Sequence, residues 1–417
     1  MGYIENFLPH ALARLGHEVH IVTSTAQVYY DQPFYNKTYR QFLGEPITAA
    51  GIIEEQGVLI HRLEFKKNLV NQIQLQGLTK ILRGLQPDVV HTFSHADFDT
   101  LKLAFSKLFG ARFKLFTANH NGFHALFPTK AAQDAFTWKK QLAWRAVYTI
   151  PGKFISFFIE KCFAVTTDAA DIAHKWYGVP KSKLKVTPLG VDTQQFCPDN
   201  TRRQAMRTRL HFSESDIVCI HTGKLIASKN SLLLAKAIQV LNDKYHLPIK
   251  GLFIGEGEQA AALSAMPYCT LLPYQKHADL PDYYRAADVA VWHLSVTNSF
   301  FDAVASGLPL VCGDDVETYA AVSSETTAIK SQTISFDKNN SAYRPKIVSR
   351  FCKTHDLDSL VNALRELADP SVRKTLAEQG LMEIQTKYSW AAIAKARAED
   401  YKTALKGRDT SATGVAR

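Results

Sequence analysis

Short apolar runs alternate with longer amphipathic segments along most of this chain. A short apolar run is typical of a strand buried on both faces of a parallel sheet, and apolar residues three or four positions apart are typical of the helices that cover it. The runs predict strands at 18–23, 58–63, 87–92, 112–117, 162–166, 216–221, 250–254, 288–292 and 309–312. The alternation therefore predicts an α/β fold with two doubly wound domains.

The expected domain division follows the two sets of strands. The polar stretch 199–203 lies between the sets and predicts a linker there. We expect a first domain at 1–198, a second at 199–389, and a final segment at 390–417. A long helix is expected over Trp390–Leu405, and the polar, glycine-containing tail from Lys406 is expected to be disordered.

Composition limits the class of protein. The chain has 417 residues, of which 46% are apolar and 21% charged, a soluble globular composition with enough chain for about two or three domains. A two-domain enzyme fits these bounds. No apolar run approaches the ~20 residues that span a bilayer, and the first residues lack the basic start of a signal peptide. We therefore expect a cytoplasmic protein. The six cysteines are scattered without metal-ligand spacing, so we expect them to be reduced, mostly buried and free of metal.

The formal charge of +10 favours an acidic partner, which could be a nucleotide, an anionic lipid surface or a nucleic acid. Residues 138–161 mix lysine and arginine with tryptophan and phenylalanine, as helices at a membrane surface do, which leaves peripheral membrane association open. The preferred interpretation is an ordinary amphipathic helix packed on the core. No nucleic-acid reader motif accompanies the charge, so we expect no nucleic-acid partner.

Candidate ligand-binding residues follow two of the predicted strands. Lys224 and Lys229 come just after the strand 216–221, and Gly223 allows close approach of a ligand to the backbone. In open α/β sheets, ligands bind beyond the carboxyl ends of the strands. The two lysines therefore predict an anion site at this edge, with ordinary solvated surface lysines as the alternative.

A polar helix start follows the strand 288–292. The residues that can cap this helix are Ser295, Thr297, Asn298 and Ser299, and the helix is expected to end near Gly307 and Pro309. A helix N-terminus carries about half a positive charge and free amides, which suit a phosphate group. Asn298 and Ser299 are therefore expected to complete the anion site opposite the lysines.

These two motifs resemble a known enzyme family. The spacing from Gly223-Lys224 to Lys229, and the run from Asp302 to Pro309, are similar to those of the retaining GT-B glycosyltransferases of family four. Further matching segments at 15–24, 86–91, 178–198 and 280–288 extend the resemblance over nearly the whole chain. The resemblance implies two Rossmann-like domains facing a cleft, a nucleotide diphosphate sugar as donor, and neither cofactor nor bound metal. It also implies that the final helix crosses back onto the first domain.

The resemblance also assigns roles to residues. Lys224 and Lys229 would hold the donor diphosphate, Asp302 would hold the ribose hydroxyls, and His120 would face the donor sugar from the loop after strand 112–117. His120 and Lys229 are the candidate catalytic residues. Asp302 could instead close a capping box with Ser299, and His120 could simply hold its own loop. A histidine that titrates near neutral pH would make activity sensitive to pH.

Two departures from the family pattern bear on activity. Relatives often carry an acidic residue about eight positions before the equivalent of Asp302, where this chain has Leu294. Relatives also begin with an apolar strand, and Met1 stands where that strand should have ended. The resemblance therefore implies that the first strand of the amino-terminal domain is missing, which we interpret as a start codon assigned too late, the alternative being a defective form.

The expected activity is transfer of a hexose-type sugar, with retention at the anomeric carbon, from a nucleotide diphosphate donor to a glycan or lipid-linked acceptor, as in polysaccharide biosynthesis. The alternative is a non-catalytic nucleotide-sugar-binding relative that has lost transfer through the Leu294 change and the missing strand. A nucleotide-sugar epimerase of the same architecture is a weaker alternative, because no well-placed carboxylates are evident.

Overall fold

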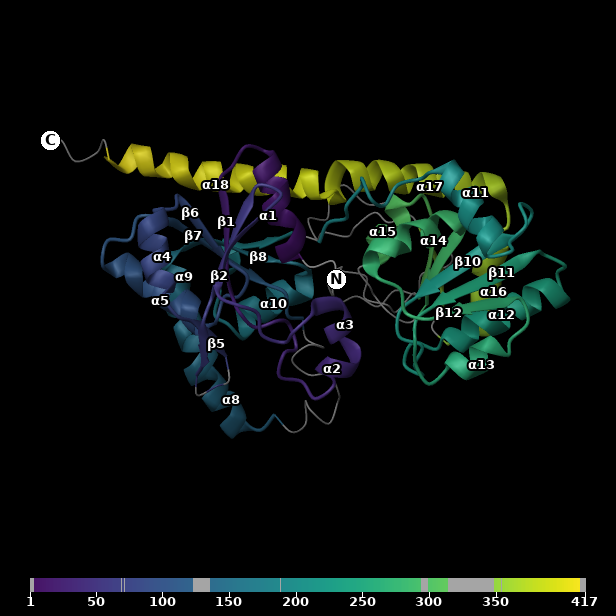
Figure 1. Cartoon of the computed structure of the whole chain (residues 1–417), viewed down its shortest axis with the longest axis horizontal. Coiled ribbons are helices and arrows are strands. Elements are labelled where there is room, and N and C mark those ends of the chain that lie inside the picture. The colour runs from purple at the N-terminus through teal and green to yellow at the C-terminus, as the bar shows by residue number, and fades with distance from the viewer. Residues whose placement is uncertain are drawn as a thin grey trace. The chain divides into compact units, whose positions relative to one another are not determined.

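A computed structural model describes residues 4–68, 70, 72–122, 136–187, 189–293, 299–313, 349–353 and 355–412. The chain forms two compact units, one of Glu5–Pro188 with Ala394–Arg417 and the other mainly of Leu189–Ile393. Each unit is an α/β fold with its own strands and its own hydrophobic core (Figure 1). This confirms the predicted fold class.

The unit of Leu189–Ile393 is built on one parallel sheet. In the described part of the chain its strand order is β12-β11-β10-β13-β14-β15, and all neighbours are parallel. The strands are β10 (Ile217–Thr222), β11 (Ile249–Ile254), β12 (Cys269–Leu272), β13 (Val289–Trp292), β14 (Leu310–Gly313) and β15 (Ser349–Cys352). The strand order reverses between β10 and β13, and such a switch point is where doubly wound sheets bind ligands.

Helices cover both faces of this sheet, which explains the continuous apolar runs. Ile217 and Cys219 of β10 pack into one core cluster, whereas Val218 and Ile220 pack into the other, because successive side chains of a strand point to opposite faces. The helices are α11 (Asn200–Arg209), α12 (Ser231–Asp243), α13 (Ala260–Ser264), α14 (Leu280–Ala286), α15 (Ser299–Ala305), α16 (Leu357–Glu366) and α17 (Pro370–Glu383).

The other unit carries its strands in separate sheets. One sheet has the order β1-β3-β2, a second has the order β6-β7-β8-β9, and β4 pairs with β5. The strands are β1 (Val19–Ser24), β2 (Gly51–Glu55), β3 (Val58–Leu63), β4 (Phe65–Lys67), β5 (Ile73–Leu75), β6 (Val89–Thr92), β7 (Lys114–Asn119), β8 (Ile159–Ala164) and β9 (Leu184–Val186). Val22 of β1 and Val90 of β6 pack against the same core cluster, so the two larger sheets share one core.

The helices of this unit include most of the last helix of the chain, from Ala394 onward. They are α1 (Ile4–Arg14), α2 (Tyr35–Thr38), α3 (Arg40–Leu43), α4 (Leu78–Leu85), α5 (Phe98–Leu108), α8 (Trp138–Trp144), α9 (Ile150–Phe158), α10 (Thr167–Lys175) and α18 (Trp390–Ala412). Tyr401 and Ala404 of α18 pack against Phe116 and Phe163 of the sheet. Among the described residues, no helix is both long enough and apolar enough to cross a bilayer.

Two local predictions are wrong. The stretch 199–203 is not a linker but the first turn of α11, because Asp199 caps the helix by accepting a hydrogen bond from the Arg202 amide at 3.0 Å. The helix expected to end at Leu405 continues to Ala412, because no proline follows and one glycine is tolerated inside a helix. Of the expected disordered tail, 413–417 lies outside the described residues.

Candidate functional site

The loop that carries the two candidate lysines follows β10 at the switch point of the sheet. We call residues 223–229 the lysine loop. Gly223 comes directly after the strand and donates its amide to the Ile254 carbonyl at 3.0 Å. Lys224 is exposed, and Lys229 is half-buried before the start of α12. The loop therefore presents one cation to solvent and one against the protein surface.

The Lys229 ammonium lies in an unfavourable position for a lone cation. Burial and, to a smaller extent, the charge of Lys224 lower the pKa of Lys229 from its usual value. An anion bound near Lys229 would oppose both effects, since a nearby opposite charge raises the pKa of a lysine. A phosphate group is such an anion, so the electrostatics favour the predicted anion site without showing which ligand fills it.

A second loop holds the lysine loop in place. Gly255, just after β11, has φ of +151°, and a Cβ there would lie 1.8 Å from the Gly223 carbonyl oxygen, so only glycine fits. The Leu225 amide donates to the Glu256 carbonyl at 2.9 Å, and the Ala227 amide donates to Glu258 Oε1 at 2.8 Å. The motifs that predict the site do not include this loop, although its Gly-x-Gly pattern after a predicted strand is a usable signal.

Asp302 lies in α15, beyond the end of β13, and is only 7% exposed. His277 Nε2 lies 3.0 Å from Asp302 Oδ2, at hydrogen-bond distance. Burial raises the pKa of Asp302, and the hydrogen bond with His277 partly offsets this rise. His277 thus holds one carboxylate oxygen of Asp302. His277 comes from a loop without a sequence motif, so nothing in the sequence pointed to it.

Tyr284 links the two halves of the candidate site. Its hydroxyl lies 2.9 Å from Thr222 Oγ1, the residue before Gly223, and it also forms a hydrogen bond with the Ser299 side chain. The Trp292 indole N–H donates to the Thr222 carbonyl at 2.9 Å. The end of β10 and the start of α15 are therefore joined through buried hydrogen bonds. Of the other sequence candidates, Ser299 begins α15, whereas Asn298 and Leu294 lie outside the described residues.

His120 lies in the other unit, just after β7. Its Nδ1 is 3.7 Å from Glu5 Oε1 of α1, and its ring lies edge-on to Phe93 with centroids 5.9 Å apart. Burial and the nearby charge of Arg397 lower the pKa of His120 to about 4. The expectation that His120 titrates near neutral pH is therefore wrong, because a half-buried imidazole beside a cation stays neutral there.

The two neighbouring histidines that could have served a catalytic role are structural. His95 is buried and bonds Thr117 Oγ1 and the Gly152 carbonyl, both at 3.0 Å. His91 Nδ1 lies 2.8 Å from the Tyr401 hydroxyl of α18. No group of three or more histidine, cysteine or acidic side chains in the described residues could hold a metal ion.

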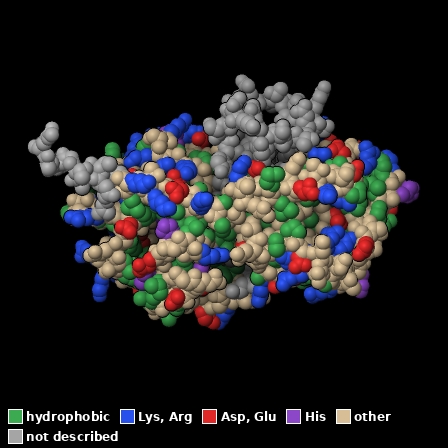
Figure 2. Space-filling view, turned by 90° about the horizontal axis from the view of Figure 1, so that it is seen from above, with side chains coloured by type: hydrophobic (Ala, Val, Ile, Leu, Met, Phe, Trp, Pro, Cys, Tyr) green, Lys and Arg blue, Asp and Glu red, His purple; other side chains and the backbone are tan. Residues whose placement is uncertain are grey.

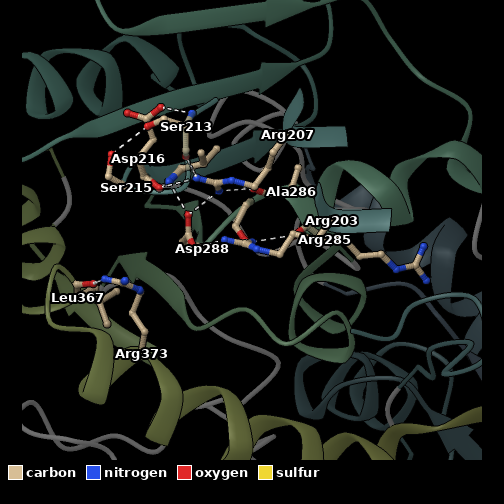
Figure 3. A network of polar contacts seen from close by, with 12 residues as sticks. Arg203, Arg207, Ser213, Ser215, Asp216, Arg285, Ala286, Asp288, Leu367 and Arg373 are labelled. Atoms are coloured by element: carbon tan, nitrogen blue, oxygen red, sulfur yellow. Dashed lines mark hydrogen bonds and ion pairs between the residues drawn. The ribbon is translucent and has the colours of Figure 1, made fainter. Parts of the chain in front are cut away.

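A cavity of about 650 Å³ lies at the opposite edge of the sheet, where Asp288 and Pro309 precede β13 and β14. Its arginines already have partners (Figure 3). Arg203 donates to Asp288 Oδ1 at 2.7 Å, Arg285 donates to the Cys197 carbonyl at 2.8 Å, and Arg373 donates to the Ala368 carbonyl at 2.9 Å. Ligands of such sheets bind at the carboxyl edge. The cavity lies at the other edge and its arginines are paired within the fold, so it is not the candidate site.

Comparison with known proteins identifies the family of this chain. The sequence matches Glycosyltransferase Family 4 over residues 8–195 and Glycosyl transferases group 1 over residues 216–337. It is 23% identical to the UDP-Gal:alpha-D-GlcNAc-diphosphoundecaprenol alpha-1,3-galactosyltransferase of Escherichia coli, over 73% of this chain and 72% of that protein. It is also 28% identical to a D-inositol 3-phosphate glycosyltransferase of Rhodococcus erythropolis, over 37% of this chain and 38% of that protein.

A solved structure shares the fold. Anabaena HepE, determined in complex with UDP and glucose, aligns with a TM-score of 0.55 at 13% identity, over 92% of this chain and 100% of that chain. The two family matches lie on the two α/β units, and the lysine loop falls within the second match. The chain therefore belongs to the glycosyltransferase family 4, group 1 enzymes of the GT-B fold, which transfer sugars from nucleotide-sugar donors.

Proposed function

We propose that this glycosyltransferase moves a hexose-type sugar, with retention at the anomeric carbon, from a nucleotide diphosphate to a glycan or lipid-linked acceptor. The observation that carries the proposal is the lysine loop at the switch point of the sheet, joined through Tyr284 to the helix that bears Asp302. In this account, the unit of Leu189–Ile393 binds the donor and the unit of Glu5–Pro188 binds the acceptor.

Each proposed donor contact uses the chemistry of the side chain. Lys224 and Lys229 bind the diphosphate, and Gly223 lets it approach the backbone. Asp302, held by His277, accepts hydrogen bonds from the ribose hydroxyls. Ser299 lies at the start of α15 beside Tyr284. Asn298, which lies outside the described residues, is a proposed donor contact by resemblance to the family alone.

The reaction develops negative charge on the leaving group. The bond between the anomeric carbon and the diphosphate oxygen breaks, the acceptor hydroxyl oxygen bonds to the same face of that carbon, and the hydroxyl proton passes to the departing diphosphate. Lys224 and Lys229 stabilise the growing charge because they are in place before the bond breaks. His120, neutral at physiological pH, contributes a hydrogen bond to the donor sugar and is not itself titrated.

The relatives suggest where to look for the donor and acceptor. The Escherichia coli relative is named for UDP-galactose and a diphosphoundecaprenol acceptor, and HepE was solved with UDP and glucose. We therefore propose a UDP-sugar as the first donor to test and a lipid-linked saccharide as the first acceptor. A lipid-linked acceptor also implies peripheral contact with a membrane.

A donor panel tests the proposal. Purified protein is incubated with UDP-galactose, UDP-glucose, UDP-N-acetylglucosamine and GDP-mannose, with and without a short-chain polyprenyl-diphosphate saccharide, and free nucleotide and product linkage are measured. We expect acceptor-dependent nucleotide release from one donor and an α-linked product. Nucleotide binding without release from any donor would instead support the non-catalytic alternative.

A further inference from the structure

The unit that contains Glu5–Pro188 exposes a group of large apolar side chains on neighbouring helices. We call it the basic apolar surface; it consists of α5, residues 138–158 and Phe109. Exposed fractions are 80% for Phe157, 87% for Phe109 and 69% for Trp138. Phe105, Leu108, Leu142 and Ile150 are also exposed. Contiguous exposed apolar residues of this kind mark an interaction site.

Residues 138–158 form one continuous helical stretch. A π-helical turn at Arg145–Thr149 joins α8 to α9, and it falls just before Pro151, which has no amide to donate to the preceding turn. In α9, Ile155 and Gly152 face inward and are buried, with Gly152 against the Tyr177 backbone. The inner side of this stretch therefore packs on the core, as predicted. That packing does not explain the large apolar side chains exposed on its outer side.

The helices lie next to each other. The rings of Phe105 in α5 and Phe154 in α9 have centroids 4.6 Å apart, and Figure 1 shows α5 and α9 side by side with α8 below them. The outer residues Leu142, Ile150 and Phe157 recur at spacings of seven or eight positions, which places them on one side of the helical stretch. The exposed residues thus form a joined surface.

The charged residues in the 138–158 part of this surface are all positive. Residues 136–158 contain Lys139, Lys140, Arg145 and Lys153, all exposed, and no aspartate or glutamate. In α5, the carboxylate of Asp99 is paired with Lys102 at 2.9 Å. By contrast, cations and carboxylates are interspersed on the face of the molecule drawn in Figure 2. A protein partner that carries charges of both signs would not match the charge of such a stretch, whereas an anionic surface would.

We propose that the basic apolar surface docks on an anionic lipid membrane. Aromatic and aliphatic side chains would enter the headgroup region, and the four cations would face lipid phosphates, as in helices that lie in the membrane plane. Each lysine or arginine near an anionic membrane contributes ~1 kcal/mol, or about a fivefold gain in binding. The proposal agrees with a lipid-linked acceptor but depends only on the surface itself.

Vesicle flotation tests this proposal. The full chain is mixed with vesicles of phosphatidylcholine alone, or of phosphatidylcholine with one-third phosphatidylglycerol, and the bound fraction is measured at low and high salt. We expect binding to the anionic vesicles that weakens with salt. The double variants L142S/F157S and K139E/K140E are each expected to weaken binding at least tenfold, because they remove inserted area and favourable charge respectively.

Controls separate this surface from general effects. The variant M382S removes a side chain that is 64% exposed in the other unit, and it should bind vesicles like the unchanged protein. Nucleotide release from the donor without vesicles should be unchanged in L142S/F157S, so failure to bind lipid and failure of the proposed activity are distinguishable. Absence of binding to anionic vesicles, or a dimer in light scattering that L142S/F157S abolishes, would overturn the membrane proposal.

Discussion

Asp302 places a carboxyl group where the fold alone does not favour a charge. The side chain is 7% exposed, burial raises its pKa, and one of its oxygens is held by His277. A buried charge of this kind costs stability unless a ligand or partner uses it. Asp302 therefore fits a binding role better than a purely structural one, although its spacing from Ser299 also suits a capping box.

The variant Asp302→Asn separates these two roles. If Asp302 holds the ribose, nucleotide affinity measured by calorimetry should fall about tenfold to a hundredfold, since a hydrogen bond to a charged group contributes roughly 1.5–3 kcal/mol. The melting temperature should stay the same or rise, because the buried charge is gone. If Asp302 only caps the helix, nucleotide affinity should stay the same and the melting temperature should fall. The exposed neighbour Asp279→Asn serves as the control and should change neither quantity.

The candidate site residues found from the sequence are those that come with a motif. Gly223, Lys224, Lys229 and Asp302 lie where spacing and strand ends predicted them. Tyr284 lies in the matching segment 280–288, but its contact with Thr222 depends on the fold, as does the contact of His277 with Asp302. The pKa of His120 was also beyond the sequence, since it depends on burial and on Arg397 from a helix far along the chain.

Helix α18 is held against the sheet by a buried arginine. Arg397 is 2% exposed, lies with its guanidinium carbon 3.3 Å from the centre of the Phe163 ring, and has Nη1 at 3.5 Å from His91 Nε2. Burial lowers the pKa of Arg397, and Tyr401 and Asp400 partly offset this. The side chain thus contributes mainly through packing of its length against the sheet.

Two substitutions of Arg397 test this view. Arg397→Ala should lower the free energy of unfolding by about 3 kcal/mol, because it leaves a cavity, whereas Arg397→Met should cost much less, because it keeps the volume without a buried charge. Urea unfolding provides the measurement, with the exposed Lys402→Ala as control. Equal losses for the two variants would show that the charge and its contact with His91 matter more than the packing.

Strands β1 and β6 differ from the strands of the other unit. In the described residues, β1 pairs only with β3 and β6 only with β7, and both strands are largely half-buried, whereas β10 and β13 are buried throughout. The sequence predicted these strands from their apolar runs.

Hydrogen exchange measures this difference directly. Amides of β1 and β6 should exchange faster than those of β10 and β13, because fewer of them lie in a fully buried, doubly paired ladder. Mass spectrometry of peptides that cover 19–24, 89–92, 217–222 and 289–292 gives the comparison. Protection in β1 and β6 equal to that in β10 would mean that both of their edges are paired in solution.

The histidines with lowered pKa predict that the stability of the whole protein falls in acid. Burial lowers the pKa of His95, His120, His221 and His293 to about 4. In the unfolded chain these groups titrate near 6.5, so the unfolded state binds more protons between pH 6.5 and 4. Their contribution to stability is complete above pH 6.5 and is lost as the pH falls toward 4.

The melting temperature should therefore fall steadily between pH 6.5 and 4, as measured by circular dichroism. Glu5, Asp97 and Asp302, whose pKa burial raises, oppose this trend near the acid end of the range. The variant His120→Gln should lose less stability over the same range than the unchanged protein. A melting temperature that is flat from pH 7 to pH 4 would contradict the account of neutral buried histidines.

The kinetics of one pair of variants test most directly whether the lysine loop binds the donor diphosphate. Lys229→Ala removes the half-buried cation, and Lys236→Ala removes an exposed lysine of α12. With the donor found active, Lys229→Ala should lower kcat/KM at least a hundredfold, with part of the loss in kcat because the charge develops as the bond breaks. Lys236→Ala should match the unchanged protein. Unchanged kcat/KM in Lys229→Ala would contradict the proposed site.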